Sequence, residues 1–94
     1  MFSSSKPNVI KSDTGFSIEI LGRIGLNYQE GDKVAFIDSE MLMTDPPSVA
    51  IWKKRIETWQ PPYDNEKISE AKREEIVKNI SDALKWRNVY AKII

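Results

Sequence analysis

Alternating apolar and polar residues predict two neighbouring strands early in the chain. Residues 16–21 carry apolar side chains at every second position, and residues 24–29 repeat the pattern. In a strand such side chains point to one face, so each segment is expected to be half-buried. The link 21–23 is short enough for a tight hairpin, and Gly31 can take the positive φ that a second hairpin turn requires.

Further strands are expected in the middle of the chain, interrupted by a loop. Residues 33–38, KVAFID, alternate again and predict a third strand. The alternation breaks in residues 39–48, SEMLMTDPPS, whose prolines lack the amide hydrogens that a central strand needs. We expect a loop there, with at most a helical turn over 40–43. Residues 49–60, VAIWKKRIETWQ, then predict two short strands that meet near residues 53–55.

The clearest periodicity predicts an amphipathic helix after Ser69, which is a suitable N-cap. Side chains recur at spacings of three and four residues and form one largely apolar stripe: Arg73, Ile76, Val77, Ile80, Ala83 and Leu84. The opposite face is polar and is expected to face solvent: Lys72, Glu75, Asn79 and Asp82. Residues 89–94, VYAKII, are β-branched and aliphatic, so they predict a last strand that returns to the sheet.

Together these elements indicate an α+β fold. We expect an antiparallel β-meander of four to five strands, one C-terminal amphipathic helix packed on one face, and a final C-terminal strand. Residues 1–14 are rich in polar side chains and are expected to form a mobile N-terminal arm, which contributes at most Val9 and Ile10 to a short edge strand. Residues 15–94 are then expected to form a single α+β domain.

Histidine and cysteine are absent from the 94 residues of the chain. Their absence excludes disulfides, thiolate zinc sites and thiol nucleophiles, and it removes the usual general base and the commonest nitrogen ligand for metals. We therefore expect no enzymatic activity and no cofactor. The sequence has no apolar run of the length that secretion or membrane spanning requires, so we expect a cytoplasmic protein without a membrane partner.

Acidic residues are concentrated in the middle of the chain, although the net charge is zero. Between Glu30 and Asp45 five acidic residues stand against Lys33 alone. If these side chains share a face they create a local negative field, and otherwise they form a solvated edge of the sheet. Their spacing differs from that of a calcium loop, so no metal site is expected. The candidate partner-binding residues in this segment are three acids and two apolar neighbours: Asp38, Glu40, Asp45, Met41 and Leu42.

One cluster combines basic and aromatic residues. Trp52 and Trp59 bracket the three bases at 53–55, an arrangement that suits single-stranded RNA through stacking and phosphate contacts. The alternative is that both tryptophans belong to the core and that the bases mark a turn. The zero net charge and the pI near 6.3 favour this second interpretation.

The stretch TWQPPYD, residues 58–64, precedes the predicted helix and allows two interpretations. As a seam, it crosses from the sheet to the helix, Trp59 covers the start of the helix, and the prolines hold the connection extended. As a binding surface, it exposes Trp59 or Tyr63 as an anchor for a partner, because such rings are common at binding hot spots. Trp59 and Tyr63 therefore complete the candidate partner-binding residues.

The order of several segments resembles immunity protein family 74, a group of small immunity proteins of bacterial polymorphic toxin systems. The resemblance rests on GRIGLNYQEGD, an apolar strand, Glu40 with two following aliphatic residues, an aromatic strand, WQPPYD and ISEAKREEI, and it covers roughly Ile18 to Leu84. It implies a non-catalytic cytosolic inhibitor that binds the toxic C-terminal domain of a secreted or contact-delivered protein, often a nuclease. No direct contact with nucleic acid is expected, and a homodimer is possible.

Two alternatives of other classes remain at this point. One is a small RNA-binding module that uses Trp52–Arg55 and Trp59. The other is a homo-oligomeric structural protein.

Overall fold

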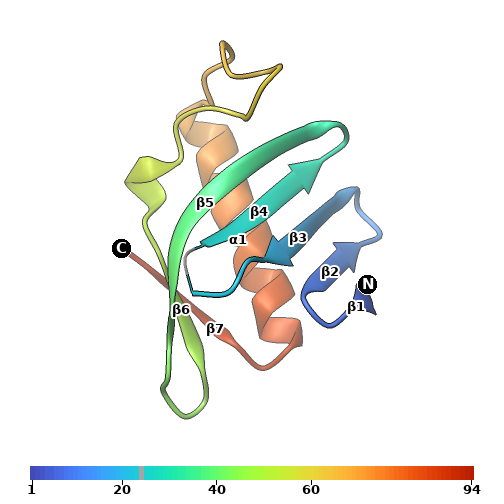
Figure 1. The fold of residues 1–94 in the computed structure, drawn as a ribbon, viewed down its shortest axis with the longest axis vertical. Coiled ribbons are helices and arrows are strands. Elements are labelled where there is room, and N and C mark those ends of the chain that lie inside the picture. Colours follow the sequence, from blue (N-terminus) through green and yellow to red (C-terminus); the bar gives the residue numbers. More distant parts are fainter. Residues whose placement is uncertain (24) are drawn as a thin grey trace.

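The computed structural model of the chain describes residues 1–23 and 25–94, and within these residues seven strands form a curled sheet with an α-helix on one face (Figure 1). The strands lie in the sheet in chain order and have these bounds: β1 Phe2–Lys6, β2 Val9–Ser12, β3 Phe16–Ile20, β4 Gly25–Glu30, β5 Lys33–Leu42, β6 Ser48–Ile51 and β7 Tyr90–Ile93. A 3-10 helix, η1, spans Lys53–Arg55, and helix α1 spans Glu70–Trp86. The predicted α+β class is confirmed, with more strands than the four or five expected.

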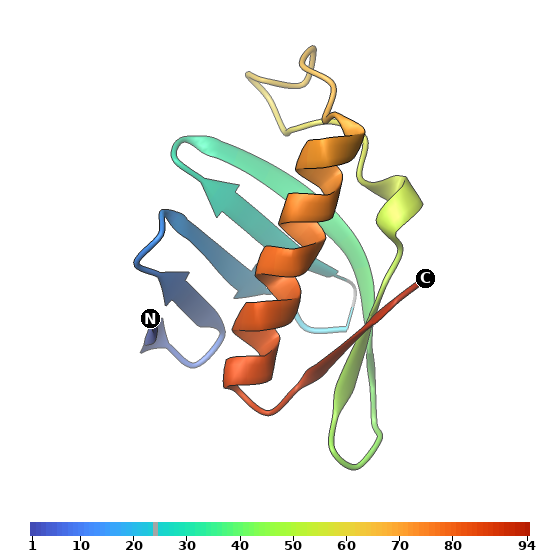
Figure 2. The same cartoon turned by 180° about the vertical axis from the view of Figure 1, so that it is seen from behind.

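Neighbouring strands from β1 to β6 pair antiparallel, whereas β6 and β7 pair parallel. Parallel neighbours need a long crossover connection. Here η1, residues 56–69 and α1 provide that connection, and the helix lies across one face of the sheet (Figure 2). The final strand predicted in residues 89–94 is confirmed as β7, at the edge of the sheet.

Strand β5 bends, so that its two halves pair with different neighbours (Figure 1). Residues 33–38 pair with β4, and residues 39–42 pair with β6. Because β4 begins only at Gly25, opposite Asp38, the second half of β5 extends with β6 as a ribbon beyond the other strands.

This β5–β6 ribbon replaces most of the loop predicted over residues 39–48. Its ladder reaches Leu42, opposite Ser48, so the turn is confined to residues 43–47, which include both prolines. The loop prediction is wrong because it relied on the loss of alternation between apolar and polar residues. That loss has another cause here, since the consecutive residues Met41 and Leu42 are both half-buried within the strand. Neither face of the ribbon is purely polar, and the alternation that marks a half-exposed strand is lost.

The core lies between the sheet and α1. The Ser69 Oγ accepts a hydrogen bond from the backbone N–H of Lys72 at 3.1 Å, so the predicted N-cap is confirmed. The apolar residues of the predicted stripe are all buried: Ile76, Val77, Ile80, Ala83 and Leu84. They share one core with inward side chains of the strands, among them Ile10, Ile18, Tyr28 and Ile37. Neither α1 nor any other helix of the described residues is both long and apolar enough to cross a membrane.

The first residues form strands instead of the predicted arm. β1 pairs with β2, and β2 joins the sheet with Ile10 opposite Ile18. Ile10 is fully buried, and Arg87, just after α1, donates a hydrogen bond to the backbone O of Pro7 at 2.6 Å. The expectation for residues 1–14 is corrected because backbone pairing and a distant arginine hold this segment in place, and neither leaves a hydrophobic pattern in the sequence.

Two further strand predictions concern the start of the second strand and residues 49–60. Ile24, the expected start of the second strand, lies outside the described residues, and β4 begins at Gly25. Of the two strands expected in residues 49–60, the first is β6. The second is wrong, because the chain turns through η1 and then crosses to the helix, with only an isolated bridge at Thr58.

Candidate functional site

A groove lies along β5 where this strand leaves β4. Its volume is about 370 Å³. Its walls come from the turn after β3, from β5 between Asp38 and the residue that follows the strand, and from η1 with the residue before it. We call the following lining residues the β5 groove: Arg23, Asp38, Ser39, Glu40, Met41, Met43, Trp52 and Arg55.

The register of the β5–β6 ladder brings these walls together. The backbone N–H of Trp52 donates to the backbone O of Asp38 at 3.1 Å, which places η1 beside the bend of β5. From η1 the Arg55 guanidinium lies 3.7 Å from Asp38 Oδ2 and 5.3 Å from the centroid of the Trp52 ring. Arg55 therefore joins the acidic and aromatic parts of the groove, although an ion pair this exposed contributes little to stability.

Charges of both signs line the groove. Arg23 and Arg55 stand against Asp38 and Glu40. Among the ion pairs between described residues, none involves Arg23 or Glu40. The Glu40 side chain is exposed, so its carboxylate is available to a cation from outside the chain.

A second hollow, of about 480 Å³, adjoins the groove at Arg55. Phe36 lines it and is 38% exposed. The Phe36 ring lies against Gly25, because a Cβ at that position would stand 2.6 Å from the ring atom Cζ. The glycine therefore makes room for an aromatic ring beside the groove.

These side chains are suited to non-covalent recognition of another protein. Aromatic residues, methionine and arginine are enriched at the centres of protein interfaces. The groove supplies all three kinds, and Met43 is 86% exposed. Its carboxylates add the charge that speeds encounter with a cationic partner.

The structure separates the predicted partner-binding residues. Asp38, Glu40 and Met41 line the groove. Leu42, also on β5, is half-buried, and Asp45 is exposed in the turn between β5 and β6. The last two are close in sequence to the groove but are not among its lining residues.

Trp59 and Tyr63 belong to the connection between the sheet and α1. Trp59 is only 4% exposed and is part of the core. Lys33 Nζ lies 5.8 Å from the centroid of the Trp59 ring and 5.4 Å from that of Tyr63. The Tyr63 hydroxyl donates to Asp32 Oδ2 at 2.6 Å and thereby lowers the pKa of the Asp32 carboxyl. The stretch TWQPPYD thus crosses from the sheet to the helix, but its prolines lie in a turn and not in an extended connection, since the Tyr63 N–H donates to Gln60 O at 3.0 Å. Trp59 as an exposed anchor is wrong because its ring is buried in the core.

The acidic run does not form one negative surface. Glu30 and Asp32 lie at the hairpin between β4 and β5, where each is bonded to side chains of the chain itself. Asp38 and Glu40 lie at the groove. Because of this separation, Glu30 and Asp32 do not add to the negative charge at the groove, which comes from Asp38 and Glu40.

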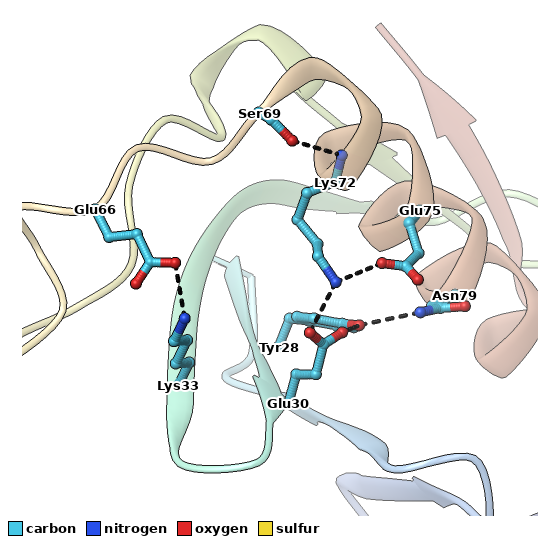
Figure 3. A network of polar contacts seen from close by, with 8 residues as sticks. All are labelled: Tyr28, Glu30, Lys33, Glu66, Ser69, Lys72, Glu75 and Asn79. Atoms are coloured by element: carbon cyan, nitrogen blue, oxygen red, sulfur yellow. Dashed lines mark hydrogen bonds and ion pairs between the residues drawn. The ribbon is translucent and has the colours of Figure 1, made fainter.

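Glu30 takes part in a polar network that joins β4 to α1 (Figure 3). The Tyr28 hydroxyl donates to Glu30 Oε1 at 2.8 Å and accepts from Asn79 Nδ2 at 3.0 Å. Lys72 Nζ donates to Glu30 Oε2 at 2.9 Å and to Glu75 Oε2 at 2.5 Å. Lys72 and Asn79 are therefore half-buried and not fully exposed as predicted, because the curled sheet reaches past the apolar stripe of the helix.

The network also shifts the pKa values of its members. Burial acts to raise the pKa of the Glu30 carboxyl, but the hydrogen bonds from Lys72 and Tyr28 outweigh it and the pKa is lowered. Burial raises the pKa of Tyr28. Hydrogen bonds to Glu75 and Glu30 raise the pKa of Lys72. Since each side chain has a partner within the chain, we interpret the network as a clamp between helix and sheet and not as a ligand site.

Two of the three basic residues at positions 53–55 take part in ion pairs within the chain. Lys53 Nζ pairs with Glu74 and lies 4.0 Å from Glu70, and Arg55 approaches Asp38. The stacking partner expected at Trp59 is buried. These contacts count against the RNA-binding alternative, which needs unpaired lysine or arginine side chains beside exposed aromatic side chains.

The sequence pattern did not identify Arg23 or Phe36 as site residues, and it did not join Trp52 and Arg55 to Asp38. That link depends on the ladder between β5 and β6, so it becomes visible only when residues 39–42 are recognised as a strand. For Phe36, the signal was the glycine at position 25 on a neighbouring predicted strand, since glycine in a strand often marks a close approach by another group.

Comparison with known protein families gives a match over most of the chain. The sequence profile of the family described as Immunity protein 74 matches residues 17–93. No curated protein and no solved structure matches the chain. The matched segment includes every lining residue of the β5 groove.

Proposed function

The chain belongs to the immunity protein 74 family, and on this premise we propose that it binds and neutralises the toxic domain of a cognate bacterial toxin. The partner is the C-terminal domain of a secreted or contact-delivered polymorphic toxin, and the protein acts in the cytoplasm of the cell that makes the toxin. The family match is the observation that carries this proposal.

Neutralisation is proposed to occur by binding and not by chemistry. The chain has no histidine or cysteine to act as base or nucleophile. One of the two carboxylates at the groove, Asp38, already lies beside Arg55. Inhibition of the toxin should therefore follow the stoichiometry of the complex, and a substoichiometric amount of the protein should leave the excess toxin active.

The β5 groove is the proposed contact surface. Exposed Glu40 would meet cationic side chains of the toxin, as expected if the toxin is a nuclease whose cleft holds phosphates. Met43 and Trp52 would supply apolar contact area. Asp45, in the neighbouring turn, would add to the negative potential that the approaching partner meets.

The test uses the purified toxin domain encoded beside the gene of this chain, with association measured by surface plasmon resonance. Glu40→Lys should slow association about tenfold at low salt, and the difference should shrink as salt is added. The matched control is Glu19→Lys, which makes the same charge change at another exposed glutamate, on β3. Equal effects of the two variants would contradict the proposal that the groove is the contact surface. Failure of the unaltered protein to bind the toxin domain would contradict the proposed function itself.

A further inference from the structure

Strand β7 forms an edge of the sheet. It pairs with β6 on one side, and no strand of the described residues pairs with its other side. Its C-terminal end lies beside η1, where the Lys53 N–H donates to Ile94 O at 3.3 Å (Figure 2). Free strand edges pair readily with other strands, and proteins usually protect them with charges, prolines or a covering segment. Here Lys92 is the one charged residue within β7.

Large apolar side chains gather at the same edge. In the described part of the chain eight large hydrophobic residues are exposed, and three of them lie in β7 or directly after it: Tyr90, Ile93 and Ile94. A concentration of this kind beside a free edge is typical of an interaction surface.

The hydrogen bonds to β6 show which backbone groups of β7 point outward. The Tyr90 N–H donates to Pro47 O at 3.1 Å, and the Ile94 N–H donates to Ile51 O at 2.8 Å. Successive residues of a strand direct their backbone groups to opposite sides. The N–H and C=O groups of Ala91 and Ile93 therefore point away from β6, toward the free edge.

We propose that two copies of this chain associate by antiparallel pairing of their β7 strands about a two-fold axis at Ala91. In this register the two Ala91 residues exchange both of their backbone hydrogen bonds. The Ile93 N–H donates to the C=O of Val89 in the second copy. The N–H of Val89 needs no new partner, because it already donates to Leu84 O at 3.0 Å.

The register matches side chains on both faces of the paired strands. On one face Lys92 stands opposite Tyr90 of the second copy, where an ammonium group and an aromatic ring attract one another. On the other face Ile93 stands opposite Val89 of the second copy, and both are apolar. The edge is therefore complementary to itself, as a two-fold interface requires.

Neighbouring registers fit less well. A two-fold axis at Lys92 would set two ammonium groups directly opposite each other. An axis at Tyr90 would pair Lys92 with Asn88, whose φ of 60° lies in the left-handed region and not in that of a strand. The partner that this edge fits is thus a second copy in the register centred on Ala91.

Disulfide cross-linking tests the register cleanly, because the chain has no cysteine of its own. In a hydrogen-bonded antiparallel pair the Cα atoms lie about 5.5 Å apart, which a disulfide can bridge, so Ala91→Cys should form a covalent dimer under mild oxidation. The two Lys92 residues are offset by two positions, beyond the reach of about 7 Å, so Lys92→Cys should cross-link at least about tenfold more slowly. Equal rates, or faster linking at position 92, would overturn the proposal.

Sedimentation equilibrium of the isolated chain tests the association itself and does not depend on any toxin. The apparent mass should rise toward that of a dimer between about 10 µM and about 1 mM, and a constant monomer mass over this range would contradict the proposal. Ala91→Pro removes an N–H that points away from β6, and it should weaken the dimer about tenfold or more. Circular dichroism checks that this variant folds, and if it does not, the cysteine variants still decide.

Discussion

Replacing Ile80 by alanine should destabilise the protein strongly, because this side chain lies at the centre of the buried stripe of α1. Ile80 is fully buried. The substitution removes three carbon atoms, which corresponds to about 2.4 kcal/mol at about 0.8 kcal/mol per buried methylene. The cavity left behind adds to this loss, so we expect a decrease of about 3–4 kcal/mol in the free energy of unfolding.

The assay is urea denaturation followed by tryptophan fluorescence and circular dichroism. A loss of this size would lower the melting temperature by roughly 12–30 °C in a domain of this length. The control is Asp82→Ala on the same helix, which removes an exposed ion pair of 3.0 Å with Lys78 and should cost less than about 0.5 kcal/mol. Similar losses for the two variants would refute the orientation of α1 on the sheet.

Two further predictions concern the clamp and the glycine beside the groove. Because the folded state lowers the pKa of Glu30, its carboxylate stabilises the fold above the ordinary value of 4.5 and this contribution is lost as the pH falls through the lowered pKa. The difference in unfolding free energy between the unaltered protein and Glu30→Gln should therefore shrink from pH 7 to pH 3 in urea titrations, and a constant difference would contradict the cause assigned to the shift. Gly25→Ala should cost about 1–3 kcal/mol, because its Cβ would lie 2.6 Å from Phe36 Cζ and 2.9 Å from Ile37 O. A double-mutant cycle with Phe36→Ala should show a smaller cost of Gly25→Ala once the ring is gone, and additive effects would show that the ring does not occupy this place.

The helix and the strands β3, β4 and β7 follow from the sequence because each carries a local signal. Ser69 caps the helix, and the apolar spacing continues to Leu84. β3 and β4 are half-buried, so their alternation survives, and β7 is rich in aliphatic residues. The N-terminal strands were not predicted, because the segment FSSSK is held by backbone pairing, which favours no particular side chain. The bend of β5 was not predicted either. A strand that curls and is partly covered on both faces loses the two-residue alternation of apolar and polar side chains.

The candidate site was predictable only in part. Asp38 and Glu40 alternate along β5, so their common position at the groove follows once that strand is known. Contacts between distant positions left no local pattern. Arg55 meets Asp38 through the register of the β5–β6 ladder, and the bond between Tyr63 and Asp32 joins residues 31 positions apart. The burial of Trp59 likewise depends on how the chain crosses from the sheet to the helix.

The measurement that tests the central claim most directly is a titration of the purified toxin domain with this protein, in which toxin activity and complex formation are followed together. The account predicts that activity falls in proportion to the complex formed and reaches zero when the toxin is saturated. It also predicts that Glu40→Lys shifts both curves together, whereas Glu19→Lys shifts neither. Toxin activity that persists when the protein is in large excess would contradict the assignment of this chain as the inhibitor of that toxin.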